Sequence, residues 1–215
     1  MTESSLTVTQ RIVRTISDLA LENEFYFAEL DGVVGDGDFG LSLANGFRKL
    51  MDEWETIDRS SPGTFLKKVS MIITSRVGGV SGAIWGTGFM RAGFAAGDKV
   101  DLTADDVIAM LRAAEEGMKK RGQSDVGDKT LLDAFIPAVD ELERVLKGGG
   151  TTQEALDAAA VKAREQTEII KPWIAKRGRA AYTGERSRDT YDAGSIAIAM
   201  MAEKIAQSWS EIQAS

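Results

Sequence analysis

The sequence predicts an all-α fold in which eight helices form a single domain over residues 1–215. Apolar residues recur at intervals of three and four, which places them on one face of a helix. The 22 glycines gather between these periodic stretches, and only three prolines occur. No stretch shows the alternation of apolar and polar residues that is typical of a half-buried strand.

Apolar stripes define the first four expected helices. The stripe that begins with Val8, Ile12 and Val13 predicts one helix that continues to Glu29. The next three helices, the last of them rich in glycine, are expected at 47–54, 65–73 and 84–94. A Ser-Ser-Pro-Gly turn at 60–63 precedes the third helix.

The fifth and sixth helices are expected from their terminal residues. Thr103 is followed closely by two aspartates, a pattern typical of a helix start, and this helix should extend to about Lys120. Asp128 can cap the sixth helix. Lys147 and the three glycines after it should end that helix, because a cation followed by glycine favours a helix C-terminus.

The last two helices also have candidate caps. Thr151 or Thr152 opens the seventh helix, and Glu154 is placed to complete a capping box. Asp192 or Ser195 opens the eighth. Most of the connections between these helices are short, as in helical bundles.

The composition excludes several kinds of function. The chain has 26 Lys and Arg against 33 Asp and Glu, a formal charge of −7 with a pI near 4.8, which argues against nucleic acid or an anionic membrane as the main partner. It has no cysteine, so disulfides, thiol nucleophiles and cysteine-ligated metals are excluded. It has no histidine, which excludes a Ser-His-Asp triad and histidine acid–base catalysis. Any metal should be a hard, oxygen-ligated ion such as Mg²⁺ or Ca²⁺.

The sequence shows no segment that would direct the chain to a membrane or out of the cell. The first ten residues are polar and lack the apolar core of a signal peptide. No apolar run reaches the roughly 18 residues that span a bilayer. A cytoplasmic protein is therefore expected.

Three aspartates among glycines form the first candidate site. Asp31, Asp36 and Asp38 lie close together in the sequence and would repel one another if unpaired. The glycines let the backbone turn and gather the carboxylates around a divalent cation, and Mg²⁺ takes carboxylates together with substrate phosphates. The alternative is that Asp36 or Asp38 caps the next helix and Asp31 is a solvated helix end.

A glycine-rich turn at 76–86 forms the second candidate site. Exposed N–H groups at a helix start bind phosphate, and Ser81 could cap the helix or donate to a phosphate oxygen. The turn lacks the Lys-Ser/Thr of a Walker A loop and follows no strand, as a dinucleotide fingerprint would. The alternative is close helix packing through Gly82 and Gly86.

A third candidate segment, 121–130, is also typical of a plain helix–helix turn. The fourth, 176–191, has no helical spacing, and loops of that length are often functional or mobile. It carries five basic residues within 176–188, and arginine matches phosphate geometry; the alternative is a solvated loop with internal ion pairs. Together the four segments predict a magnesium–nucleotide site for phosphoryl transfer. The competing hypothesis is a helical scaffold whose clusters are only caps and turns.

These segments resemble the nucleotide-binding L subunit, or L domain, of dihydroxyacetone kinases over nearly the whole chain. The resemblance is carried, in order, by DxxxxDGD at 31–38, GGVSG at 78–82, GDKT at 127–130, GRAAYTGERS at 178–187 and DAGS at 192–195. It implies an eight-helix antiparallel barrel, with ADP or ATP and two Mg²⁺ ions in the loops at one end.

The resemblance also assigns eight residues to the site. The Mg²⁺ pair would be held by Asp31, Asp36 and Asp38. The other five would surround the nucleotide: Gly79 and Ser81 at the phosphates, Thr130 toward the adenine, Arg179 by the phosphates as the catalytic residue, and Gly194 beside the nucleotide.

The family resemblance further implies a partner. In this family the ketose is bound through a histidine on a separate K subunit or domain, so this chain is expected to be half of an enzyme that phosphorylates a short ketose. Phe39 and Ser42 stand where the phosphotransferase-dependent subunits have histidine and asparagine, and the donor stays open between ATP and a phosphocarrier subunit of the phosphotransferase system. The resemblance is also compatible with a four-carbon ketose as substrate, with a homodimer, and with a non-catalytic nucleotide-binding regulatory module.

Overall fold

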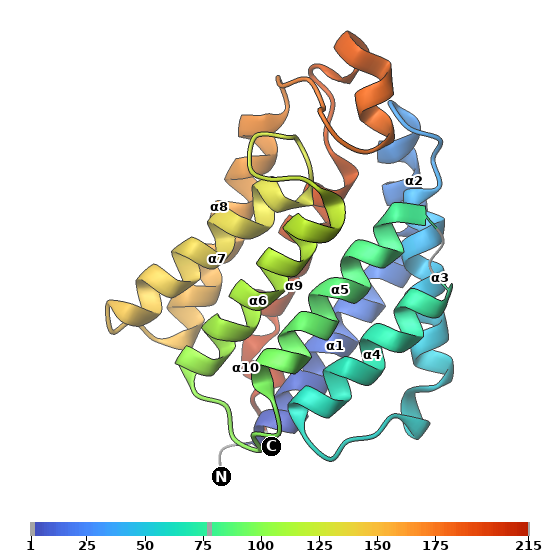
Figure 1. Cartoon of the computed structure of the whole chain (residues 1–215). Helices are drawn as coiled ribbons and strands as arrows, with labels where there is room; N and C mark the ends of the chain where they lie inside the picture. Colours follow the sequence, from blue (N-terminus) through green and yellow to red (C-terminus); the bar gives the residue numbers. More distant parts are fainter. Residues whose placement is uncertain (1–2, 77–78, 215) are drawn as a thin grey trace.

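The computed structural model describes residues 3–76 and 79–214, and this part of the chain is helical with no strand. Two 3₁₀ helices, η1 and η2, accompany the α-helices (Figure 1). None of the helices in these ranges is long and apolar enough to cross a membrane. The elements are α1 (Ser5–Glu22), α2 (Glu24–Gly32), α3 (Phe39–Asp52), η1 (Trp54–Thr56), α4 (Pro62–Arg76), α5 (Gly79–Ala96), α6 (Ala104–Gly122), α7 (Leu131–Lys147), α8 (Thr152–Ile170), η2 (Arg179–Ser187), α9 (Ala193–Gln207) and α10 (Trp209–Ile212).

The long helices alternate in direction and enclose a common core. Each helix from α2 to α9 packs against the next helix along the chain, and α9 packs back against α1, which closes the ring. As Figure 1 shows, the ends of α2, α4, α6 and α8 and the starts of α3, α5, α7 and α9 therefore meet at one end, and the start of α1 and the short α10 lie at the other. The predicted all-α antiparallel barrel is confirmed.

The core of the barrel is built from the apolar stripes. Phe27, Leu43, Phe47, Phe65 and Ile73 are completely buried and come from the three neighbouring helices α2, α3 and α4. Burial of side chains of this size stabilises the fold by about 1.5–3 kcal/mol each. The core thus fixes the helix axes, and through them the relative positions of the loops at the end.

One predicted helix is divided in the structure. The apolar stripe predicts an unbroken first helix to Glu29, but Asn23 interrupts it with φ −109° and ψ 19°, giving α1 and α2. The Asn23 side-chain amide donates to the carbonyl of Leu19 at 2.9 Å, and such local bonds compete with the helical backbone. With α1 and α2 taken as the first helix, α3 to α9 are the seven others, and α10 is a short addition.

Most of the predicted caps are confirmed. Thr103 and Thr151 begin α6 and α8 with complete capping boxes, and Asp192 begins α9. The Asp192 carboxylate accepts the Ser195 N–H at 2.6 Å. Each such cap satisfies a helix N–H that has no intrahelical partner, and its loss costs about 1 kcal/mol.

The close approach of α2 and α3 predicts a sensitive position. A methyl group at Gly40 would overlap the Glu24 carbonyl and approach the Ala28 nitrogen at 2.6 Å, both of them backbone atoms that cannot rotate away. We expect Gly40→Ala to destabilise the chain by about 1–3 kcal/mol, measured by urea unfolding. Gly32→Ala in the same helix pair is the control, because its nearest neighbour lies 3.9 Å away. Equal stability of the two variants would contradict this account of the packing.

Candidate functional site

The three predicted aspartates come together at the α2–α3 connection. Asp31 lies in the last turn of α2, and Asp36 and Asp38 precede α3. One carboxylate oxygen from each lies within 4.8 Å of the others. Burial, and then the neighbouring charge of Asp31, raise the pKa of Asp38, so the cluster is electrostatically strained without a cation.

The hydrogen bonds of this loop do not favour helix capping as the role of Asp36 and Asp38. Asp38 occupies the N-cap position of α3 but makes no side-chain bond to the helix. Instead, the Asp31 carboxylate reaches across the loop and accepts the Phe39 N–H at 3.4 Å. The carboxylate oxygens of Asp36 and Asp38 thus stay directed to the cluster rather than to α3.

Two glycines make this loop conformation accessible. Gly37 has φ +73°, a left-handed value that glycine adopts without strain. A side chain at Gly35 would meet the Asp31 carboxylate at 2.5 Å and its carbonyl at 2.8 Å. Any larger residue at Gly35 would therefore displace the Asp31 carboxylate.

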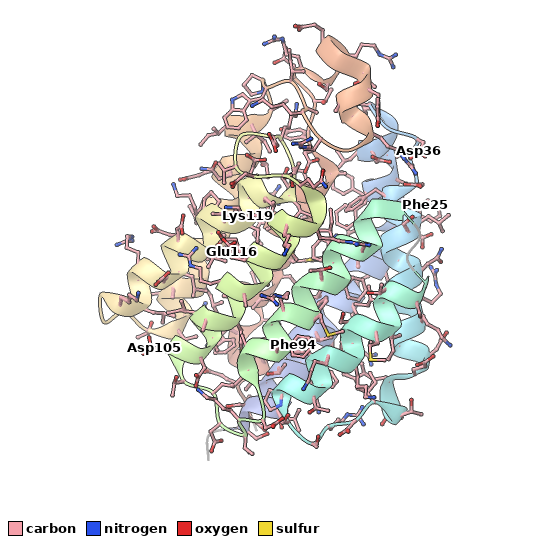
Figure 2. The ribbon with its side chains drawn as sticks, viewed as in Figure 1. Phe25, Asp36, Phe94, Asp105, Glu116 and Lys119 are labelled. Atoms are coloured by element: carbon pink, nitrogen blue, oxygen red, sulfur yellow. The ribbon has the colours of Figure 1, made fainter. Side chains whose placement is uncertain are left out.

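Arg179 supplies the positive charge that faces the carboxylate cluster. It is the first residue of η2, and its guanidinium forms ion pairs with Asp36 and, at 2.7 Å, with Asp38. All three side chains are about half exposed, and Figure 2 shows Asp36 at the end of the barrel beside η2. Residues 171–191, called the cap here, therefore lie over the cluster and contact it through Arg179.

A cavity of about 520 Å³ opens between the cluster and the cap. Five of the predicted site residues line it, namely Asp31, Asp38, Thr130, Arg179 and Gly194. A methyl group at Gly194 would lie 3.0 Å from the Leu131 side chain. Gly194 thus lets the starts of α9 and α7 approach each other at the floor of the cavity.

The remaining predicted residues lie at the same end of the barrel. Asp36 flanks the cavity through its ion pair with Arg179. Gly79 and Ser81 lie in the first turn of α5, and Gly78, part of the same motif, is outside the described residues. The predicted phosphate contacts of Gly79 and Ser81 stay a prediction.

The antiparallel topology adds a positive field at this end. The helices α3, α5, α7 and α9 all begin there, and the start of an α-helix carries about half a positive charge. At α7 and α9 side-chain caps already accept some of the free N–H groups. Four such starts around one cavity favour an anion. The combination of carboxylates on one side and helix starts on the other suits a polyanion that arrives with a divalent cation.

The structure corrects one predicted cap at the α6–α7 turn. The sequence predicts Asp128 as the start of the sixth helix, but Thr130 is the N-cap of α7, and Asp133 completes a capping box with it. The Asp133 carboxylate is buried and accepts the N–H groups of Thr130 at 2.7 Å and Gly127 at 2.6 Å. The Thr-x-x-Asp spacing at 130–133 is the sequence signal that could have identified it.

Three charged groups at the floor of the cavity, Lys129, Asp133 and Asp192, were not predicted as site residues. Lys129 is 2% exposed and has φ +60°. Burial raises the pKa of Asp192 to about 7, with a further increase from Asp133, while the Ser195 N–H and the Lys129 ammonium lower it. The floor of the cavity therefore holds the buried ammonium of Lys129 near the carboxyl group of Asp192, and the buried Asp133 acts on that same carboxyl group.

Fold and site together define an all-α barrel domain whose one end is built to receive a cation and an anion. The chain belongs to the DAK2 domain family, which it matches over residues 33–207.

Relatives of known name cover most of the chain. It is similar to the ADP-binding subunit of the PEP-dependent dihydroxyacetone kinase of Escherichia coli strain K12, with 34% identity over 84% of this chain and 86% of that subunit. It is also similar to the L-erythrulose kinase of Pectobacterium atrosepticum, with 32% identity over 87% of this chain and 32% of that protein.

Solved structures share the fold. The native dihydroxyacetone kinase of C. freundii superposes with a TM-score of 0.73 and 25% identity, over 93% of this chain and 34% of that one. Its complex with AMP-PNP and Mg²⁺ superposes with a TM-score of 0.69 and 25% identity, over 97% of this chain and 35% of that one. This chain therefore spans about a third of that kinase.

The raised pKa of Asp192 predicts a pH dependence of stability. The folded carboxyl binds a proton that the unfolded one has released, so the free energy of unfolding should fall as the pH rises from about 4 to about 7. One proton gives a slope of at most about 1.4 kcal/mol per pH unit. The chain has no histidine or cysteine to titrate in this range. Urea unfolding between pH 5 and 8 measures the slope.

The matched variant for this measurement is Asp192→Asn. Asparagine also serves as an N-cap, so α9 should form normally while the titrating group is gone. We expect a clearly smaller slope between pH 5 and 7 in the variant, because only Asp38 and Asp133, whose pKa values are also raised, can still contribute. The same slope in both proteins would assign the proton to another group.

Proposed function

We propose that this chain binds a magnesium complex of ADP or ATP in the cavity and serves as the nucleotide-binding subunit of a dihydroxyacetone kinase. The observation that carries the proposal is the gathering of Asp31, Asp36 and Asp38 within 4.8 Å, opposite Arg179 and at the end where four helices begin. The similarity to an ADP-binding kinase subunit over most of both chains supports it.

The carboxylate cluster suits Mg²⁺. The donors are hard oxygens, with no histidine or cysteine in the chain to favour a softer metal. Burial, and then the charge of Asp31, raise the pKa of Asp38, and a bound cation would offset both effects by favouring the ionised carboxylates. When bound, Mg²⁺ neutralises charge on the phosphates during phosphoryl transfer. Asp31, Asp36 and Asp38 would hold it.

Arg179 would bind the phosphates once a metal occupies the carboxylates. Its guanidinium is half exposed and carried on the cap, so it can turn from Asp36 and Asp38 to a phosphate oxygen. Charge on the transferring group is then stabilised from a side opposite the aspartates. Thr130 and Gly194 line the part of the cavity away from the cluster, where the rest of the nucleotide would lie.

The reaction would transfer the γ-phosphoryl group of the nucleotide to a hydroxyl of the ketose. The new bond joins phosphorus to the ketose oxygen, the bond to the ADP oxygen breaks, and the hydroxyl proton needs an acceptor. This chain offers no histidine for that proton. A K-type partner that binds the ketose would supply the base.

Exposed apolar side chains near the cavity provide a surface for such a partner. Leu41, in the first turn of α3, is 50% exposed, and Val33, at the end of α2, is 59% exposed. Tyr182 on the cap is 92% exposed. These residues flank the carboxylate cluster from both α2–α3 and the cap, which is where an acceptor has to approach.

Removal of one carboxylate should weaken metal-dependent nucleotide binding. We expect Asp36→Asn to weaken ADP binding in Mg²⁺ by about tenfold or more, because the cluster loses one of its three ligands. Asp52→Asn, at the far end of α3 and exposed, is the matched control. Isothermal titration with and without Mg²⁺ measures both. The metal role would be refuted if Asp36→Asn bound ADP in Mg²⁺ as tightly as the Asp52→Asn control does.

Catalysis should require a partner and its docking surface. The chain alone should phosphorylate neither dihydroxyacetone nor erythrulose, and a K-type ketose-binding subunit should restore turnover with one of them. Leu41→Ser should raise the partner concentration needed for half-maximal turnover, whereas Phe94→Ser, which is also exposed but lies toward the other end of α5, should not (Figure 2). Turnover by the chain alone would contradict the proposal.

The nucleotide retained by the purified chain distinguishes the two possible phosphoryl donors, ATP and a phosphocarrier subunit. Stoichiometric ADP that stays bound through dialysis with Mg²⁺ identifies a PEP-dependent subunit like the Escherichia coli relative. Free exchange of ATP, seen as a higher melting temperature on addition of Mg-ATP, identifies an ATP-dependent subunit. Chromatography of the nucleotides released by denaturation reads out the first case.

A further inference from the structure

Lys129 is a buried lysine that does not contact the carboxylate cluster. It lies in the turn between α6 and α7, directly before Thr130, the N-terminal capping residue of α7, and is 2% exposed. Its ammonium donates three hydrogen bonds to backbone carbonyls: to Lys171 at 2.8 Å, Trp173 at 2.9 Å and Ser187 at 2.6 Å. All three of its N–H donors are therefore satisfied by main-chain oxygens.

The three carbonyls belong to the two ends of the cap. Lys171 and Trp173 follow directly on α8, and Ser187 is the last residue of η2. One ammonium thus holds the ends of the loop together, and this loop carries Arg179. Fixing the ends of such a loop lowers its conformational entropy and sets the position of its tip.

Neighbouring bonds support the same junction. The buried Ser187 hydroxyl accepts the Ala175 N–H at 2.9 Å and donates to the Gly184 carbonyl at 2.6 Å. The Lys176 N–H donates to the Asp128 carbonyl at 3.0 Å. The base of the cap is therefore joined to the α6–α7 turn by both backbone and side-chain bonds.

The choice of lysine at this position has a cost that needs an explanation. Burial lowers the pKa of Lys129, against the nearby charges of Asp192 and Asp189, which raise it. Its φ of +60° is strained for a residue with a side chain. An apolar side chain would avoid the desolvation but leave three carbonyls without a donor.

We propose that Lys129 is a positioning residue, whose ammonium clamps both ends of the cap to the start of α7 and so places Arg179 over the carboxylate cluster. The consequence for phosphate binding rests on the proposed function, but the clamp itself concerns only this chain. It can therefore be tested without nucleotide or partner. Loss of the clamp should release the cap and leave the barrel closed.

The first test is hydrogen exchange of the free chain, followed by mass spectrometry. In Lys129→Met we expect peptides from 174–188 to exchange about tenfold faster or more, as for a locally opened segment. Peptides from α1 to α5 should keep wild-type protection. Lys204→Met, an exposed lysine on α9, is the matched control and should change neither region.

The absence of cysteine allows a chemical rescue. Lys129→Cys introduces a single thiol, which 2-bromoethylamine alkylates in denaturant: a carbon–sulfur bond forms, bromide leaves and the buffer takes the thiol proton. The product is lysine with sulfur in place of one methylene. After refolding it should restore slow exchange at 174–188, whereas the neutral product with iodoacetamide should not.

Binding of Mg-ADP supplies the functional readout. Lys129→Met should release ADP about tenfold faster or more, and the aminoethylated protein should approach the wild-type rate. The clamp proposal is overturned if a folded Lys129→Met protein keeps slow exchange at 174–188. It is also overturned if 2-bromoethylamine and iodoacetamide restore slow exchange equally in Lys129→Cys. A chain that binds no nucleotide but shows the exchange pattern keeps the clamp and refutes the proposed function.

A second variant covers the case in which Lys129→Met does not fold. Lys129→Arg keeps the buried charge, but a planar guanidinium cannot reproduce the three bonds of an ammonium. We expect a folded barrel with faster exchange at 174–188. Wild-type exchange there, or faster exchange spread evenly over all helices, overturns the clamp.

Discussion

The repulsion among three carboxylates is the constraint on which the rest of the site depends. Two like charges about 4 Å apart repel each other by roughly 1–4 kcal/mol, depending on how much water surrounds them. The loop at 31–38 holds them together because the Gly35 and Gly37 positions permit no ordinary side chain. A rigid barrel supports this loop at both ends, and a positive charge has to complete it.

The barrel topology supplies that charge in two forms. Alternating helix directions bring four helix starts to one end, and their dipoles add positive charge there. At α7 and α9 the capping carboxylates of Asp133 and Asp192 offset part of that charge. The cap adds a movable charge, the guanidinium of Arg179. Under the proposed function, the charge of the helix starts would suit the phosphates of a nucleotide, and the Arg179 guanidinium would leave the carboxylates when a metal binds them. The closed barrel and the position of the site thus both follow from the alternating directions of successive helices.

The sequence predicts what local rules determine, and fails where distant segments meet. The caps at Thr103 and Thr151 follow from side chains within one turn, and both are predictable. The break at Asn23 escapes prediction because its apolar stripe continues through it. Lys129 escapes prediction for a different reason: its three acceptors lie 42, 44 and 58 residues away. A motif can mark such a lysine, but only tertiary structure shows what it binds.

Two contacts join the cap, near the end of the sequence, to earlier parts of the chain: one is made by Arg179 and the other by Lys129. Arg179 holds the tip of the cap to the α2–α3 connection, and Lys129 holds its base to α7. The base is buried and fully hydrogen-bonded, whereas the ion pairs at the tip are half exposed and therefore weak. If a metal occupies the aspartates, as the proposed function requires, the tip is the contact that would yield. The cap would then move on a fixed base, and a nucleotide could enter without disturbing the barrel.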